Sequence, residues 1–218
     1  MDASSTRETG IGGAPTASNL QRTSFDVVMI AFHWATVAIV LGLLSTAVMH
    51  EQVHDVQTRV LLLRVHRSLG VTIWLLTVSR LLWRTALATL PPFPAHMVNI
   101  HRTFVTTGEY CLYGLLIIQP LTGFGATIAR GRAFPLFWGN VPPLMPRFPM
   151  LEDALFMLHQ IGAWTLVVLI TGHAMAALFH HFILRDETLA RMMPVAVLRR
   201  RGREVASDGG EAEALAEG

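Results

Sequence analysis

The sequence predicts an all-α fold, a four-helix bundle that threads up and down through a lipid bilayer. The first observation is composition. The 218 residues are 52% hydrophobic and 15% charged, which leaves too few polar side chains to cover a water-soluble domain. The second is length, because four segments reach the roughly 20 mostly apolar residues that a membrane-spanning helix needs. We therefore expect the bilayer to be the solvent for most of the chain.

The expected spans are residues 27–48, 61–83, 107–128 and 154–184. The first and fourth contain no charged residue apart from histidine. The second is the least apolar, since Arg64 and Arg67 near one end and Arg80 near the other must snorkel towards water. Prolines between the later spans interrupt helix continuation. Residues 25–194 thus form one membrane domain, and we expect the flanks 1–24 and 195–218 to be disordered.

The basic residues predict the orientation of these spans. All 17 are arginine, and with four spans eleven of them lie on the side of the two termini and six on the other side. Because the cytoplasmic side carries the excess of basic residues, both termini are predicted to be cytoplasmic. The net charge of only +2 argues against a nucleic-acid partner. The single cysteine, Cys111, excludes an internal disulfide, and we expect it to be buried as a small apolar residue.

Four of the ten histidines lie inside apolar segments, several residues from either end: His33, His66, His159 and His173. Ionisable side chains at that depth are costly and usually functional. His50, His54, His96 and His101 lie in the connectors, where we interpret them as solvated or interfacial. The four embedded histidines are therefore the candidate site residues.

Helical spacing arranges these four histidines in pairs. His159 and His173 are 14 residues apart, which places them within roughly 40° on one helix face and about 21 Å apart along its axis. Antiparallel threading brings His33 to the depth of His173 and His66 to the depth of His159. A pair of imidazoles between facing helices suits a non-covalently held haem b, and the chain has no C-x-x-C-H motif for a c-type haem. We predict two haems b with these four axial ligands.

Two alternatives at this site stay open. The four histidines could be hydrogen-bonded core residues, with or without a zinc ion, although zinc usually takes cysteine or carboxylate ligands at short spacing and the spans supply none. His180 lies seven residues after His173 on nearly the same face. We favour His173 as the ligand, because His180 falls at the membrane boundary, where it could contact a haem propionate.

Several stretches resemble a known family. They are Phe32-His33-Trp34, His66-Arg67-Ser68-Leu69-Gly70, Arg80-Leu81-Leu82-Trp83-Arg84, Pro120-Leu121-Thr122-Gly123, His159-Gln160-Ile161-Gly162, and the run from Gly172-His173 through His180-His181 and Arg185-Asp186 to Met192-Met193-Pro194. Together they make residues 25–194 similar to the bacterial di-haem cytochrome b561 family, which includes superoxide:quinone oxidoreductases. The resemblance implies that the same four histidines are the axial ligands. It also implies an inner-membrane location and membrane quinone, ubiquinone, as the electron acceptor.

The resemblance further implies superoxide as an electron donor that approaches from the periplasm. The predicted outer side carries Arg59, Arg64, Arg67, Arg130 and Arg132, a basic surface that could attract a small anion. Arg64, Arg67 and Arg130 are the candidate residues for that attraction, and pairing with lipid headgroups or haem propionates explains them equally well. One alternative function is a cytochrome b anchor subunit that passes electrons between a dehydrogenase or hydrogenase partner and quinone. Another is a haem-free, metal-binding membrane protein.

Overall fold

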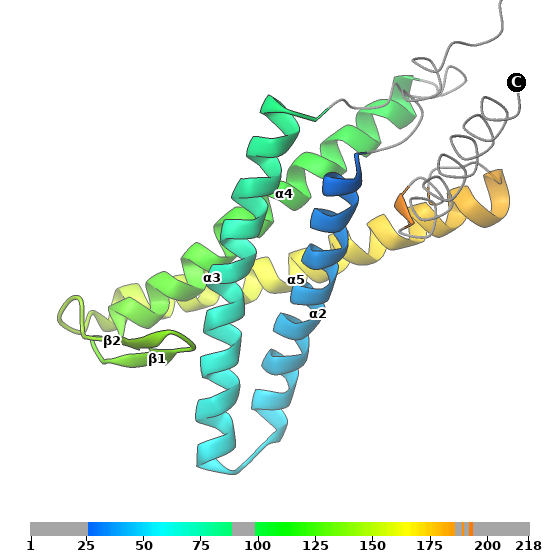
Figure 1. The fold of residues 1–218 in the computed structure, drawn as a ribbon. Helices are drawn as coiled ribbons and strands as arrows, with labels where there is room; N and C mark the ends of the chain where they lie inside the picture. The colour runs from blue at the N-terminus through cyan, green and yellow to red at the C-terminus, as the bar shows by residue number, and fades with distance from the viewer. Residues whose placement is uncertain (1–25, 89–98, 186–188, 190–191, 194–218) are drawn as a thin grey trace, which may run out of the picture.

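The computed structural model describes residues 26–88, 99–185, 189 and 192–193. Its elements are α2 (Val27–Gln52), α3 (Val56–Ala86), α4 (Asn99–Ala129), β1 (Phe134–Leu136), β2 (Gly139–Val141), α5 (Pro149–Phe179) and the π-helical turn η2 (His180–Leu184) (Figure 1). The terminal segments expected to be disordered, 1–24 and 195–218, lie outside the described residues.

Each of the four long helices is long and apolar enough to cross a membrane, which confirms the four expected spans. Helices α2, α3 and α4 extend beyond the apolar segments that predicted them, since polar residues continue the helix past the hydrocarbon. Helix α5 begins earlier than expected and ends at Phe179, and the last five residues of the expected span form η2. Asp26 begins α2, where its carboxylate accepts from the Val28 N–H at 3.2 Å. Asp55 begins α3 in the same way, and hydrogen bonds from Thr58 hold the pKa of its carboxyl below the usual value.

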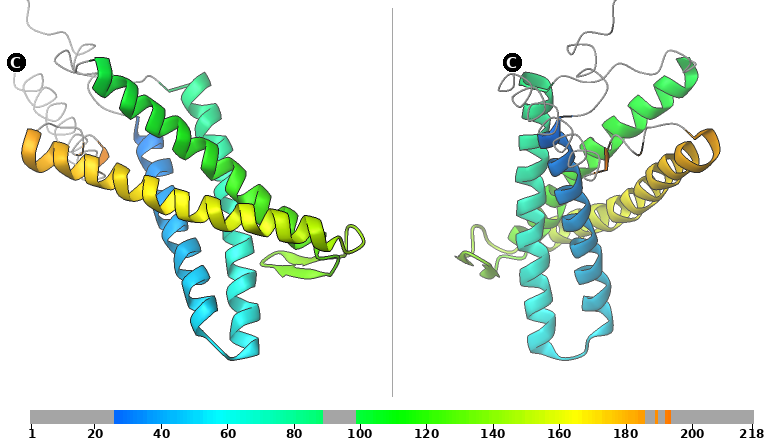
Figure 2. Two further views of the ribbon diagram at one scale, coloured as in Figure 1. Left: turned by 180° about the vertical axis from the view of Figure 1, so that it is seen from behind. Right: turned by 45° about the vertical axis from the view of Figure 1, so that its right-hand side comes forward.

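The helices form two antiparallel hairpins, α2 with α3 and α4 with α5 (Figure 1). Figure 2 shows that the two hairpins cross each other at a steep angle, so they do not run side by side along their whole length. Helix α3 packs against α4 near the crossing. The up-and-down, all-α architecture is thus the predicted one, and its centre is the place where the hairpins meet.

Few apolar side chains are buried within the described part of the protein. Met29, Val40, Ile73 and Leu166 are among them. Many large apolar side chains instead point outwards, as expected of helices whose neighbour is lipid and not water. The expectation that Cys111 is buried was wrong, because its side chain is exposed on α4. An apolar run in a membrane helix cannot distinguish a lipid-facing side chain from a buried one.

Hydroxyl groups within the helices are satisfied locally. The hydroxyls of Thr36, Thr77 and Thr171 each donate to the carbonyl four residues earlier, at 2.7–2.8 Å. Ser68, which is fully buried, does the same with the Arg64 carbonyl at 2.9 Å. Because no water reaches the hydrocarbon, such bonds let hydroxyl residues sit inside a span without an unsatisfied donor.

A β-hairpin occupies the proline-rich connector before α5, which the sequence analysis treated only as a linker. Strand β1 pairs antiparallel with β2, with Phe134 opposite Val141. The hairpin is fastened to α3, because the Phe137 N–H donates to the Ser68 hydroxyl at 2.9 Å and Arg64 Nε donates to the Leu136 carbonyl at 3.0 Å. Three-residue strands carry too little alternation to be predicted from sequence.

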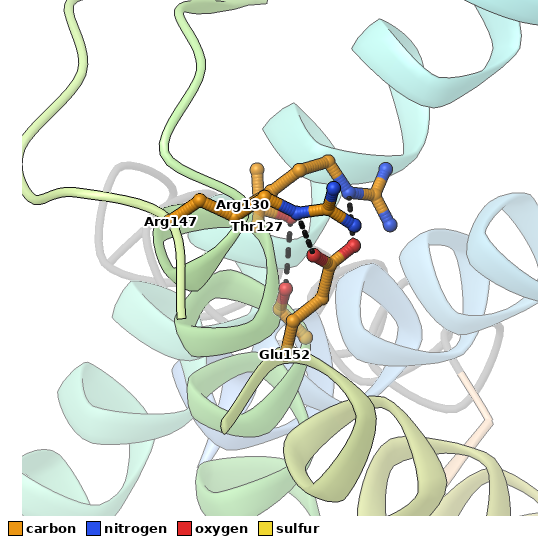
Figure 3. Close-up of polar contacts among 5 residues, drawn as sticks. Thr127, Arg130, Arg147 and Glu152 are labelled. Atoms are coloured by element: carbon orange, nitrogen blue, oxygen red, sulfur yellow. Dashed lines mark hydrogen bonds and ion pairs between the residues drawn. The ribbon is translucent and has the colours of Figure 1, made fainter. Parts of the chain in front are cut away.

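The turn from α4 towards the hairpin depends on a glycine and an ion-pair cluster. Gly131 has a φ of +65°, and a Cβ there would lie 2.6 Å from the Arg147 backbone nitrogen. Close by, the Glu152 carboxylate accepts from Arg130 Nε at 2.7 Å and from Arg147 Nε at 3.3 Å (Figure 3). Glu152 also lies in the first turn of α5, where a negative charge complements the helix dipole. The cluster therefore ties together the end of α4, the connector and the start of α5.

Replacing Glu152 with Gln should loosen this end of the molecule, because two arginines lose their shared carboxylate. We expect the midpoint of thermal unfolding in detergent to fall by about 2–4 °C, measured by circular dichroism. Glu51→Gln is the matched control, since Glu51 is exposed and meets only His50, at 3.6 Å. Equal shifts in the two variants would show that the cluster contributes no more than a surface charge.

Candidate functional site

The structure brings the four embedded histidines together as two pairs. His33 on α2 faces His173 on α5, with 6.3 Å between the ring centroids. His66 on α3 faces His159 on α5, with 6.2 Å between the centroids. We call these the inner pair and the outer pair, after the predicted orientation. Helix α5 thus contributes one imidazole to each pair, and the other hairpin contributes the second.

The spacing within each pair fits two imidazoles that bind one metal ion from opposite sides. A metal–imidazole bond is about 2.0–2.1 Å and the ring centroid lies about 1.1 Å beyond the nitrogen, so two such rings have centroids about 6.3 Å apart. Both observed separations, 6.3 and 6.2 Å, agree with this value. Each pair can therefore supply two opposed axial ligands.

The kind of metal group follows from what else surrounds the pairs. Among the residues that the structure describes, no three His, Cys, Asp or Glu side chains converge as a metal site. A structural zinc site needs four protein ligands and a catalytic one needs three. Two opposed imidazoles leave four equatorial positions, which the nitrogens of a porphyrin occupy in a haem. The donor set therefore fits haem and does not fit zinc.

Both imidazoles of the outer pair are held through Nδ1. His66 Nδ1 lies 3.1 Å from the Leu43 carbonyl and 3.1 Å from the Thr46 hydroxyl, both on α2. The Thr46 hydroxyl itself donates to the Leu43 carbonyl at 2.9 Å. A carbonyl acceptor requires the proton on Nδ1, so Nε2 is left with its lone pair free for a metal.

His159 is held in the same way from α4. Its Nδ1 lies 3.0 Å from the Gln119 carbonyl and 3.3 Å from the Thr122 hydroxyl. In each case the threonine follows the carbonyl residue by three positions, Thr46 after Leu43 and Thr122 after Gln119. The outer pair therefore has matching supports on its two sides.

Glycines make room for these contacts between α4 and α5. A Cβ at Gly123 would lie 2.7 Å from Cε1 of the His159 ring. A Cβ at Gly162 would collide with the Gln119 side chain, whose amide nitrogen donates to the His159 carbonyl at 2.6 Å. Both positions therefore need glycine for the outer pair to keep this geometry.

The inner pair has different neighbours. The Trp34 ring meets His33 edge-on, with 5.9 Å between centroids, and Trp34 Nε1 donates to the Met192 carbonyl at 2.8 Å. The described residues after η2 are thereby joined to α2 beside His33. His180 lies in η2, where its ring meets the Phe179 ring with 6.5 Å between the centroids.

Three buried polar atoms have no hydrogen-bond partner among the residues that the structure describes. They are Trp74 Nε1, Arg80 Nε and Tyr113 Oη. Trp74 follows His66 by eight residues on α3, and Arg80 follows it by 14. Buried donors without partners are rare in proteins and point to a missing acceptor group. Two of the three lie on α3 and Tyr113 lies on α4, which is consistent with a polar cofactor between the helices.

The three candidate outer arginines are placed by the connector. Arg64 donates to the Leu136 carbonyl, Arg67 lies over the Phe134 ring at 5.6 Å, and Arg130 shares Glu152 with Arg147. Within the described chain no carboxylate lies within ion-pair distance of Arg64 or Arg67. Two uncompensated guanidinium groups therefore remain near the outer pair, one of them adjacent in sequence to His66.

Comparison with known proteins identifies the group to which this site belongs. Residues 24–195 match the family model of the prokaryotic cytochrome b561. The chain is 29% identical to "Cytochrome b561 homolog 2" of Escherichia coli K12 over 177 residues, covering 78% of this chain and 90% of that protein. It is 28% identical to "Cytochrome b561 homolog 1" of the same organism, over 78% and 97% of the two chains. It is 33% identical to "Probable superoxide oxidase CybB" of Yersinia pestis, over 60% and 73%.

The family model covers the four helices and both histidine pairs, and membership implies haem b binding and electron transfer in a membrane. The four spans make the protein multi-pass. The chain belongs to the prokaryotic cytochrome b561 family.

Proposed function

We propose that this protein holds two haems b and transfers electrons from superoxide at its outer face to ubiquinone in the membrane. The proposal rests on the inner and outer histidine pairs. In each pair the distance between the ring centroids is the one expected of two imidazoles that share a metal ion. His33 and His173 would hold the inner haem, and His66 and His159 the outer one. When bound, haem supplies reversible one-electron transfer.

The chemistry balances with two protons from water as the further reactant. Superoxide gives up one electron and becomes dioxygen. Ubiquinone takes up two electrons and two protons and becomes ubiquinol, so two superoxide ions serve each quinone. The protein separates the two sites, because the ligands on α5 lie 14 residues apart, or about 21 Å along the helix.

The support for superoxide as donor is electrostatic. Superoxide is a small anion, and the uncompensated Arg64 and Arg67 give the outer pair a positive surround. Arg130 contributes less in this proposal, since Glu152 offsets its charge together with that of Arg147. The name of the Yersinia pestis relative, a probable superoxide oxidase, agrees with this donor. By the arginine distribution, both termini lie in the cytoplasm of a bacterium and the outer pair faces the periplasm.

The second candidate is an anchor subunit that passes electrons between a dehydrogenase or hydrogenase and quinone. The exposed Phe137 and Trp138 at the tip of the β-hairpin favour it, since a partner protein could cover them. Co-purification from native membranes decides between the two. A haem-containing protein isolated alone that is reduced by superoxide supports the first candidate, and a stable complex with a dehydrogenase supports the second.

The histidine pairs should control the two haems separately. His66→Ala or His159→Ala should remove the outer haem, and His33→Ala or His173→Ala the inner one, so that haem falls from about two to about one per chain. Reduced-minus-oxidised spectra and haem quantification measure this. His180→Ala is the control and should retain both haems. If it loses one, His180 and not His173 is the ligand on α5.

Gly123 should be needed for the outer haem alone. An added methyl group would press on the His159 ring, and displacing a metal ligand from its supports typically costs about 10–100-fold in affinity. We expect Gly123→Ala to weaken outer-haem binding by about tenfold, measured by haem titration of protein expressed under haem limitation. Gly114→Ala on the same helix, where a methyl group meets nothing within 4 Å, should bind both haems normally. Unchanged outer-haem affinity in Gly123→Ala would contradict the assignment of His159.

Arg64 and Arg67 should accelerate reduction by superoxide through their charge. Neutralising both to Gln should slow haem reduction by superoxide about tenfold or more at low salt and flatten its ionic-strength dependence. Reduction by neutral ubiquinol should change little. Arg59→Gln with Arg132→Gln is the matched control, because it removes the same charge from two exposed positions on the same side. Equal losses with both donors would mean that Arg64 and Arg67 position the haem and do not recruit the anion.

A further inference from the structure

Arg80 is a buried cation without a counter-ion inside the described protein. Only 9% of its surface is exposed, and its Nε has no hydrogen-bond partner. No carboxylate of the described residues lies within ion-pair distance of it. A charge removed from water is strongly destabilising unless an opposite charge or hydrogen-bond acceptors compensate it. Arg80 therefore requires a partner that the described part of the chain does not provide.

The neighbouring groups make this requirement specific. The Arg80 guanidinium lies over the Tyr113 ring at 5.3 Å, and Arg84 lies over the same ring at 5.7 Å. Arg84 has its own partner, because both of its terminal nitrogens donate to the two oxygens of Glu109. Glu109 is thus engaged, while the buried Tyr113 Oη has no partner within hydrogen-bond distance among the described residues. Arg80 and Tyr113 together present unused donors from α3 and α4.

The position of Arg80 places it by the inner pair. It follows His66 by 14 residues on α3, the same separation as between His159 and His173 on α5. Helices α3 and α5 run in the same direction from the outer pair. A stretch of 14 residues along α3 therefore leads from His66 to the depth of the inner pair, as it does along α5.

We propose that Arg80, assisted by Tyr113, binds a propionate carboxylate of the inner haem. The inference rests on the proposed haem at His33 and His173. A propionate is the anionic group that haem b carries, and an arginine fork matches a carboxylate. A quinone carbonyl offers the same acceptor oxygen, but it is neutral and leaves the buried charge uncompensated. Arg80 is thus a positioning residue that fixes the haem and sets the orientation of its edge.

The rate at which the purified protein loses its inner haem to an excess of apoglobin tests this proposal. Arg80→Gln should accelerate that loss about tenfold and leave the outer haem unaffected, because a charge-assisted hydrogen bond disappears. Tyr113→Phe, which keeps the ring, should have a smaller effect. Arg84→Gln is the matched control, since it also removes one positive charge beside Tyr113 but from a residue that Glu109 already satisfies. Its inner-haem loss should stay within about twofold.

Haem dimethyl ester, in which both carboxylates are neutral, separates a carboxylate contact from a merely structural role. Reconstituted with the ester, the native protein and Arg80→Gln should lose the inner haem at the same rate. A difference that persists with the ester would overturn the proposal. If Arg80→Gln loses haem normally but has a raised KM for ubiquinol, the acceptor is the quinone and the proposal is wrong.

Two further outcomes remain interpretable. If Arg80→Gln does not accumulate in membranes, Arg80→Lys replaces it in the experiment, because lysine keeps the positive charge but cannot form the two parallel hydrogen bonds of a guanidinium group. Arg80→Lys should accelerate the loss of the inner haem less than Arg80→Gln does, and this acceleration should disappear with haem dimethyl ester. A haem-loss rate of Arg80→Lys equal to that of the native protein would overturn the proposal. Native protein without haem at the inner pair would refute the proposed function itself, which is distinguishable from two bound haems with no effect of Arg80.

Discussion

The absence of water from the hydrocarbon is the constraint on which this structure depends. Every polar group inside a span must find its partner in the protein or in a cofactor, since lipid offers none. Hydroxyls meet the demand within their own helix, as Thr77 does with the Ile73 carbonyl. Imidazoles cannot, because their two nitrogens point in opposite directions. One nitrogen of His66 donates across to the Leu43 carbonyl on α2, and the lone pair of the other needs a metal or a hydrogen-bond donor. The helix pairing therefore follows from the chemistry of the ring.

The same constraint makes the two ends of the bundle different. The outer pair is supported by backbone carbonyls and by Thr46 and Thr122, groups that carry no charge. The inner end instead contains a guanidinium, two arginines stacked on one tyrosine ring, and a glutamate engaged with one of them. Carbonyls that accept from Nδ1 strengthen an imidazole as a metal ligand. The outer imidazoles therefore have supports that fix the ring and its tautomer, whereas the inner end is dominated by charged groups.

Much of this organisation could be predicted from sequence, for physical reasons. Apolar length predicts spans, and a 14-residue spacing on a helix of 3.6 residues per turn predicts which histidines share a face. The structure brings together the same partners, His33 with His173 and His66 with His159, while their role as haem ligands stays a prediction. The carbonyl supports could not be predicted, because every residue has a carbonyl and only the crossing of the hairpins selects Leu43 and Gln119. The stretch Pro120-Leu121-Thr122-Gly123 was a signal, but its purpose is visible only when Gly123 meets the His159 ring. The β-hairpin left no signal beyond its prolines.

Compensation of charge also explains why α3 could be both the least apolar span and a central helix. Arg64 and Arg67 are not exposed to lipid tails without support, because the hairpin brings the Leu136 carbonyl and the Phe134 ring to them. Arg84 has Glu109. In the described chain Arg67 and Arg80 both lack a carbonyl or carboxylate acceptor, and Arg80 is the most deeply buried of the four. The buried charge of Arg80 needs an acceptor, and in our proposal a carboxylate of haem b supplies it. The charges of the least apolar helix would then be divided between the connector, a neighbouring helix and the cofactor.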